Sequence, residues 1–239
     1  MKARFGLPLV RGLLSYLLPP YCRLCGVPVR QELPLCTGCR RDLPWTRHAC
    51  RQCGRELTGT VQAGLCGHCQ QDPPAFTATT AALHYRPPAD YLIQRLKFSG
   101  ELALAPLLAA LLGEILGTRE PPLPEQLIPV PLHRSRLRER GFNQAMEIAR
   151  ALGRRLDLPV DRRLCRRIRQ TGNQSLLPAG SRRRNVRNAF ALNGTPRARH
   201  VAIIDDVMTS GHTVNELARV LKQAGVATIE VWVIARAGH

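Results

Sequence analysis

Aromatic residues and long apolar runs are scarce in this chain of 239 residues. Phe, Trp and Tyr together make up 5% of it, so the aromatic platforms on which single-strand nucleic-acid binders stack bases are few. Beyond the N-terminus, no segment approaches the roughly 20 consecutive apolar residues that a membrane-spanning helix needs. These absences argue against a membrane-embedded protein and against base stacking as a main mode of binding.

Carboxylates and lysines are also few. The chain carries 17 Asp and Glu against 35 Lys and Arg, which gives a formal net charge of +18, and all but three of the 35 cations are arginines. Such a surface can serve solubility alone. Here, however, the arginines cluster at residues 134–140, 162–169 and 182–187. Clustering favours phosphate groups as the partner.

The first 20 residues, MKARFGLPLVRGLLSYLLPP, weakly resemble a signal peptide. Arg11 interrupts the apolar run, and no small-residue cleavage site follows before Cys22. We therefore expect an amphipathic helix at this position.

Eight of the nine cysteines form four Cys-x-x-Cys pairs: Cys22/Cys25, Cys36/Cys39, Cys50/Cys53 and Cys66/Cys69. Facing pairs of thiolates supply the tetrahedral geometry of structural zinc, which replaces a core that a short segment cannot build. Pairing of neighbours predicts two structural Zn²⁺ sites, while a cross-braced arrangement, redox activity and an iron–sulfur cluster stay open as alternatives. Thiol ligands indicate a reducing compartment, so we expect a cytoplasmic protein. Cys165 stands alone and is expected to be a buried apolar side chain.

A boundary is expected near residue 75, because Gln70 to Pro74 suit neither helix nor strand. Residues 1–75 would hold the N-terminal helix and the double zinc ribbon, and residues 76–239 a second domain. In the second part, strands at 77–85, 126–130, 163–168, 200–205 and 228–234 alternate with helices at 89–97, 101–116, 142–156 and 214–223. This alternation predicts an α/β domain with a parallel sheet flanked by helices.

The segment VAIIDDVMTSGHT, residues 201–213, combines an apolar strand, two carboxylates and a polar loop before a helix. A loop that enters a helix N-terminus offers backbone N–H groups and a favourable dipole to a phosphate. Carboxylates just before the loop can accept hydrogen bonds from sugar hydroxyls. The order of these groups predicts a ribose 5-phosphate site, whereas a mere helix cap would need only one such residue.

This segment resembles the signature of type I phosphoribosyltransferases, which bind phosphoribosyl pyrophosphate (PRPP). The resemblance implies that Asp205 and Asp206 contact the ribose 2′ and 3′ hydroxyls. It also implies that the 5-phosphate is held by Thr209, Ser210, Gly211, His212 and Thr213.

Basic residues elsewhere are candidates for the pyrophosphate of PRPP. Arg134, Arg136, Arg138 and Arg140 lie on an expected basic loop after a strand, where alternate side chains could converge on one anion. Lys97 is a further candidate. Residues 167–190 would form a lid that excludes water, with Arg169, Gln174 and Arg184 as candidates for contact. Solvated surface charge is the alternative for each of these side chains.

The whole chain resembles the ComF/GntX family of competence-associated, phosphoribosyltransferase-like proteins. The match rests on the paired N-terminal Cys-x-x-Cys knuckles, Leu96-Lys97-Phe98, the run RGFNQ at 140–144, and Thr171, Gln174, Arg184-Asn185 and Asn188-Ala189-Phe190 before the PRPP loop. The resemblance implies the type I phosphoribosyltransferase fold, PRPP with Mg²⁺ as ligand, and a role in DNA uptake or the use of imported DNA. It allows phosphoribosyl transfer to an unspecified acceptor. The alternative is a non-catalytic PRPP or nucleotide sensor that binds single-stranded DNA and works with the DNA-uptake machinery.

Overall fold

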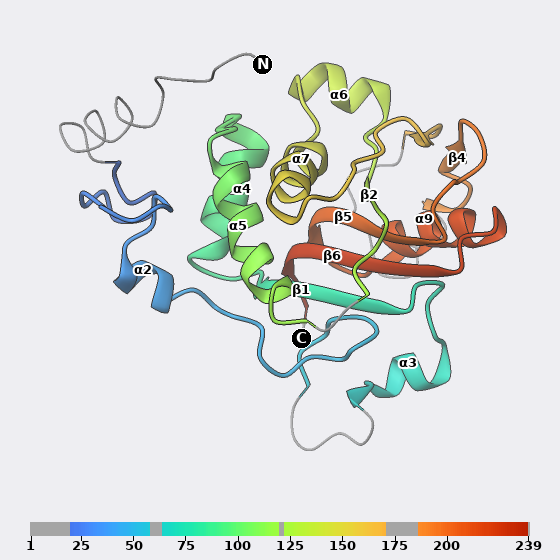
Figure 1. Cartoon of the computed structure of the whole chain (residues 1–239), viewed down its shortest axis with the longest axis horizontal. Helices are drawn as coiled ribbons and strands as arrows, with labels where there is room; N and C mark the ends of the chain where they lie inside the picture. The colour runs from blue at the N-terminus through green and yellow to red at the C-terminus, as the bar shows by residue number, and fades with distance from the viewer. Residues whose placement is uncertain (1–19, 58–63, 120–121, 171–185, 239) are drawn as a thin grey trace, which may run out of the picture. The chain divides into compact units, whose positions relative to one another are not determined.

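The computed structural model describes residues 20–57, 64–119, 122–170 and 186–238 (Figure 1). The expected N-terminal helix lies almost wholly outside these residues, as do the lid candidates Gln174 and Arg184. The chain forms two compact units, Met1–Leu43 and Pro44–His239. The first contains the short helix α2 (Thr37–Arg41), and the second contains the remaining elements described below.

A parallel sheet of four strands forms the centre of the second unit (Figure 1). Its order is β1-β6-β5-β2, and the strands are β1 (Ala78–His84), β2 (Gln126–Pro129), β5 (His200–Met208) and β6 (Thr228–Arg236). The central strands are apolar and buried along most of their length, as expected where helices cover both faces. The parallel α/β architecture predicted from the sequence is confirmed.

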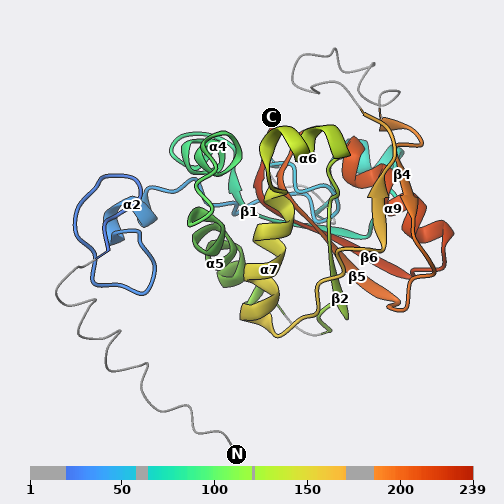
Figure 2. The same ribbon diagram turned by 90° about the horizontal axis from the view of Figure 1, so that it is seen from above.

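Helices cover both faces of this sheet (Figure 2). On one side lie α4 (Ala89–Ser99), α5 (Leu104–Leu116) and α7 (Gln144–Leu156), and on the other lies α9 (His212–Gln223). The α9 side is a single apolar cluster in which Val214, Leu217 and Leu221 pack with Val201 and Ile203 of β5. Alternate residues of β5 therefore face opposite layers, which matters for the two carboxylates of this strand.

A small antiparallel sheet joins β3 (Cys165–Arg167) to β4 (Phe190–Leu192) on either side of residues 171–185. Cys165 is 8% exposed, as expected of a buried apolar thiol.

The expected basic loop after β2 is instead a helix, α6 (Arg134–Arg140). The loop prediction is wrong because arginine, leucine and glutamate are all good helix formers and no Gly or Pro interrupts them. His133 begins the helix by accepting a hydrogen bond from the Ser135 N–H at its Nδ1 (3.3 Å), and Gly141 ends it in the left-handed conformation. Residues two apart on a helix point in nearly opposite directions, so the four arginines cannot all converge on one anion.

The second cysteine group belongs to the same compact unit as the sheet. The segment before and through it runs along β1: the Thr46 N–H donates to the Ala82 carbonyl (3.0 Å), and the Thr79 N–H donates to the Arg51 carbonyl (2.9 Å). The last ligand pair lies at the short helix α3 (Gly67–Gln71): Cys66 is its N-cap, and Cys69 lies within it. The compact units thus divide at residue 43, and a boundary near residue 75 stays a prediction. None of the helices within the described residues is long and apolar enough to cross a membrane.

Candidate metal centres and anion-binding site

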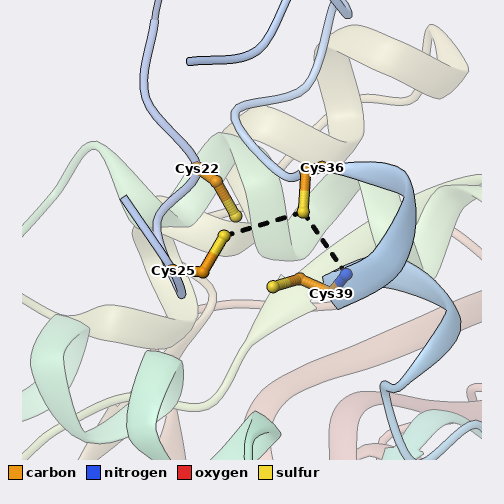
Figure 3. Close-up of side chains that lie close together, drawn as sticks. All are labelled: Cys22, Cys25, Cys36 and Cys39. Carbon is orange, nitrogen blue, oxygen red and sulfur yellow. Dashed lines mark hydrogen bonds between the residues drawn. The ribbon is translucent and has the colours of Figure 1, made fainter. Parts of the chain in front are cut away.

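The first metal centre is formed by Cys22, Cys25, Cys36 and Cys39 (Figure 3). Their four Sγ atoms lie within 4.8 Å of one another, and Sγ of Cys25 is 3.7 Å from Sγ of Cys36. A tetrahedron of sulfurs about 2.3 Å from zinc has edges of about 3.8 Å. The observed separation therefore fits a zinc ion at the centre.

The second centre repeats this arrangement with Cys50, Cys53, Cys66 and Cys69. Sγ of Cys53 is 3.6 Å from Sγ of Cys66, again close to the tetrahedral edge. All four cysteines are buried here, whereas Cys25 of the first centre is exposed. Consecutive pairs of cysteines come together in both centres, which confirms the pairing of neighbours and gives two zinc sites with four cysteine ligands each.

The pKa of one thiol in each centre is lowered, which favours the thiolate that binds a cation. Burial opposes ionisation of Cys22 and Cys50, but backbone N–H donors outweigh it and lower the pKa of Cys22 to about 6 and of Cys50 to about 7. Burial, together with the neighbouring cysteines, raises the pKa of Cys39 and of Cys69. Four crowded thiols cannot all ionise alone, so a bound dication is what would allow four thiolates.

The two carboxylates of the predicted ribose site lie within β5, which continues three residues farther than expected, to Met208. Asp206 is 2% exposed and faces the α4 and α7 layer. Its Oδ2 accepts a hydrogen bond from Lys97 Nζ (2.9 Å), and its Oδ1 accepts one from Gln144 Nε2 (3.4 Å). Asp205 faces the other way and lines a small cavity with Thr209, Gly211 and other residues of the loop. The two neighbouring carboxylates thus have different surroundings, although the resemblance gives them one role.

The polar loop after β5 leads into α9 with its donors outward. Thr209 and Ser210 are exposed, and Gly211 takes a left-handed conformation (φ 77°) immediately before the helix. His212 and Thr213 form the first turn of α9, where backbone N–H groups have no carbonyl within the helix to bind. The loop and helix N-terminus thus offer an anion-binding cradle beside Asp205.

The pKa values of the two carboxylates shift in opposite directions. Burial, reinforced by the neighbouring Asp206, holds the pKa of Asp205 well above its usual range. Asp206 is also buried, but the charge and hydrogen bond of Lys97 outweigh burial and lower its pKa. In return, Asp206 overcomes the burial of Lys97 and raises the pKa of that ammonium group. At neutral pH the Lys97–Asp206 pair is charged.

Lys97 also opens onto a cavity of about 350 Å³ formed with α6. Arg136 and Arg140 line it, whereas Arg134 and Arg138 are exposed. The Arg140 guanidinium lies 5.6 Å from the centre of the Phe98 ring and donates to Gln144 Oε1 (2.6 Å). The helix therefore brings two of the four predicted arginines to Lys97, one turn apart, and leaves the other two away from it.

One basic residue near the carboxylates falls within the expected lid, residues 167–190, but was not among its individual candidates. Arg167 of β3 is half-buried, with its guanidinium 5.5 Å from the centre of the Phe190 ring. Burial lowers its pKa, and the charge of Asp205 opposes that shift. Arg169, which was a candidate, instead donates to the Arg187 carbonyl (2.7 Å). Arg167 lies within β3, whereas Arg169 lies beyond its end.

A larger groove of about 1130 Å³ lies between α6, α7 and β3. Six arginines line it: Arg134, Arg150, Arg162, Arg163, Arg166 and Arg167. The acidic residues at its wall are Glu147, which pairs with Arg150 (2.6 Å), and Asp161, which accepts backbone N–H bonds. Arg162, Arg163 and Arg166 are exposed, and within the described part of the chain no carboxylate pairs with their side chains. The groove is a strongly cationic surface.

Comparison with known proteins matches both parts of the chain. Residues 13–70 match the double zinc ribbon domain, and residues 138–239 match the phosphoribosyl transferase domain. The chain is 38% identical over 224 residues to the DNA utilization protein YhgH of Escherichia coli O157:H7, covering 92% of this chain and 98% of the relative. It is 38% identical to Competence protein F of Haemophilus influenzae, covering 85% and 90% of the two chains. It is 28% identical to Competence protein ComFC of Bacillus subtilis, covering 83% and 82%.

Proposed function

We propose that this chain, a member of the ComF/GntX family of phosphoribosyltransferase-like proteins with a double zinc ribbon, binds PRPP at the carboxyl end of β5. The observation that carries the proposal is the meeting of Asp205, the loop Thr209–Thr213 and the N-terminus of α9 at one cavity. Backbone N–H groups and hydroxyls suit a phosphate, and a carboxylate suits a sugar diol.

The two carboxylates take different parts in this proposal. Asp205 faces the loop and accepts hydrogen bonds from the ribose hydroxyls, while Thr209 to Thr213 hold the 5-phosphate. Asp206 positions Lys97 and, through Gln144, Arg140. It therefore reaches the ligand through the cations that it fixes and not through the ribose.

Lys97, Arg136 and Arg140 are the proposed ligands of the pyrophosphate, because they share one cavity on the same side of β5. Mg²⁺ bound with PRPP would neutralise pyrophosphate oxygens, and Asp205 is the carboxylate placed to help hold it. In a transfer reaction, an acceptor nucleophile would form a bond to C1 of the ribose as the bond from C1 to pyrophosphate breaks. The site would contribute positioning and electrostatic stabilisation of the departing pyrophosphate.

The names of the relatives support a role for this chain in the uptake or use of DNA. A second candidate function, sensing PRPP without turnover while binding single-stranded DNA, is favoured by the groove of six arginines. Phosphate contacts would dominate that binding, because aromatic residues are scarce. The two thiol-rich metal centres support our proposal of a reducing, cytoplasmic setting.

The experiment that tests the proposal has two readouts on the full-length protein. Calorimetry with PRPP and Mg²⁺ should show binding that Asp205→Asn abolishes. If the protein is a transferase, pyrophosphate should be released from PRPP in the presence of at least one acceptor from a panel of bases and amines. Binding without release from any acceptor would favour the sensor. Absence of PRPP binding by the zinc-loaded wild type would refute the proposal.

A further inference from the structure

Arg236, near the end of β6, connects the second metal centre to the loop that follows β5. Its Nε donates to the carbonyl of Cys53 (2.9 Å), which is a metal ligand. Its Nη1 donates to the carbonyl of Met208 (3.1 Å) and also to that of Thr209, where the predicted phosphate loop begins. One side chain thus holds backbone atoms of both sites.

The surroundings make this link stiff. Arg236 is 4% exposed, and a buried guanidinium is strongly destabilising unless its donors are satisfied. Its Nε and Nη1 donors reach carbonyls on two separate segments. The planar guanidinium group fixes the directions of these donors relative to each other. Either segment can move only if the arginine gives up hydrogen bonds.

The metal knuckle at the other end of the link has little freedom of its own. Gly54 follows Cys53 in a left-handed conformation (φ 67°), and a Cβ atom there would lie 2.9 Å from Cγ2 of Thr79. Thr79 Oγ1 also donates to the carbonyl of Gln52 (2.7 Å). The position of the Cys53 carbonyl is therefore determined by β1 on one side and by the thiolate ligation of Cys53 on the other.

The geometry of the loop shows what the link contributes. The carbonyl of Met208 accepts hydrogen bonds from the Ala237 N–H (2.9 Å) and from Arg236, and the carbonyl of Thr209 accepts one from Arg236, so both acceptors are occupied. The backbone N–H groups that follow are left as the groups that a phosphate meets. Without Arg236, the carbonyl of Met208 would keep its bond from the Ala237 N–H, but the carbonyl of Thr209 would lose its donor. An acceptor released beside an anion would weaken the binding of that anion.

We infer that Arg236 is a positioning residue that couples the second metal centre to the phosphate loop, so that metal at Cys50, Cys53, Cys66 and Cys69 sets the affinity of residues 209–213 for phosphate. The inference rests on the proposed function of that loop. The first centre serves as the internal control, since its ligands lie in the other compact unit.

The test compares matched single-ligand losses in the full-length protein. Cys69→Ser removes a ligand from the second centre without touching Cys53, and Cys25→Ser removes one from the first. We expect Cys69→Ser to weaken PRPP binding roughly ten-fold, within the usual range of coupling between sites, and Cys25→Ser to leave it within about two-fold. Equal effects of the two substitutions on PRPP affinity would overturn the inference.

Arg236→Lys provides a variant in which both metals stay bound. Lysine keeps the charge but lacks the fork that reaches both segments, so zinc content should stay at two per chain while PRPP binding weakens. Coupling of affinities is reciprocal, so PRPP should raise the zinc affinity of the second centre of the wild type by the same factor and should not do so in Arg236→Lys. A zinc affinity that does not change with PRPP in a wild type that binds PRPP would overturn the inference.

Hydrogen exchange gives a readout that needs no ligand. Amides of residues 208–213 should exchange faster in Cys69→Ser and in Arg236→Lys than in the wild type and Cys25→Ser. Unchanged exchange in both variants would overturn the coupling, whatever the ligand. If the loop responds as expected but the wild type does not bind PRPP, the proposed function fails and the mechanical link stands.

Discussion

Lys97 Nζ lies 2.9 Å from Oδ2 of Asp206, and the side chain of that carboxylate is 3% exposed. The pair joins α4 to β5 and brings the lysine to the cavity that Arg136 and Arg140 also line. A buried carboxylate is tolerated because its charge and both oxygens are satisfied. The same contact therefore supports the fold and presents a cation to the proposed pyrophosphate.

Replacing Lys97 with Met should destabilise the protein by about 3 kcal/mol, because Asp206 would keep its burial and lose its counter-ion. The free energy of unfolding in urea measures this loss. Lys222→Met, at an exposed lysine, should change it by less than about 0.5 kcal/mol. The double variant Lys97→Met with Asp206→Leu should recover much of the stability, since no unpaired charge is left. Failure to recover would contradict this account of the pair.

Asp205→Asn should stabilise the ligand-free protein at pH 7 while abolishing PRPP binding. The folded state raises the pKa of Asp205, so the stability linked to this group is full below its unfolded pKa of about 3.9 and is lost as pH rises through the folded pKa. Melting temperatures between pH 4 and pH 8 should show the gain of Asp205→Asn growing with pH. A melting temperature below that of the wild type at pH 7 would contradict the prediction.

Asp206→Asn should behave in the opposite way. The folded state lowers the pKa of Asp206, so its stabilisation is present above about pH 3.9 and is lost as pH falls through the folded pKa. The variant should melt below the wild type at pH 7, and the difference should shrink on acidification below pH ~4. Parallel melting curves for the two Asn variants would show that the carboxylates share one environment.

Zinc should leave the protein in two phases when a chelator is added. Cys25 is exposed in the first centre, whereas all four cysteines of the second are buried, so a chelator reaches the first metal sooner. A colorimetric chelator should record one fast and one slow equivalent per chain. Cys25→Ser should remove the fast phase alone, and loss of the slow phase in that variant would reverse the assignment.

Binding of single-stranded DNA should depend on the arginine groove and on salt. Each phosphate contact contributes about 0.7 to the slope of log affinity against log salt, so replacing three contacting arginines lowers the slope by about 2. Replacement of Arg162, Arg163 and Arg166 by Ala is the test, and the same replacement at exposed Arg30, Arg47 and Arg154 is the control. Fluorescence anisotropy of a labelled oligonucleotide measures both. Equal slopes for the two triple variants would exclude the groove as the DNA site.

Local patterns predicted the elements that local physics determines. The strands and helices of the sheet follow from apolar periodicity, and the metal centres follow from thiol spacing. The different surroundings of Asp205 and Asp206 were implicit in strand alternation, but only if β5 continues past both residues to Met208. The motif alone indicated a strand that ends at the acidic pair, and so gave both side chains one role.

The remaining features depend on contacts between residues distant in sequence. Helix α6 was predicted as a loop because its charged residues have no apolar face, although their helix propensity is high. The partners of Arg236 lie 183 and 28 residues away along the chain, and no spacing rule connects them. The charge of Asp205 acts on Arg167 only because the fold brings β3 and β5, which belong to different sheets, close together.

The segment that runs from Pro44 through the second metal knuckle has a consequence for solubility. β1 is an outer strand of the sheet. Backbone hydrogen bonds occupy its free side: the Thr46 N–H donates to β1, and N–H groups of β1 donate to the carbonyls of Pro44 and Arg51. Unpaired outer strands recruit other chains and promote aggregation. A chain beginning at residue 76 would leave the edge of this strand exposed. We therefore expect the segment from Pro44 through the second metal knuckle to prevent β1 from pairing with a strand of another molecule.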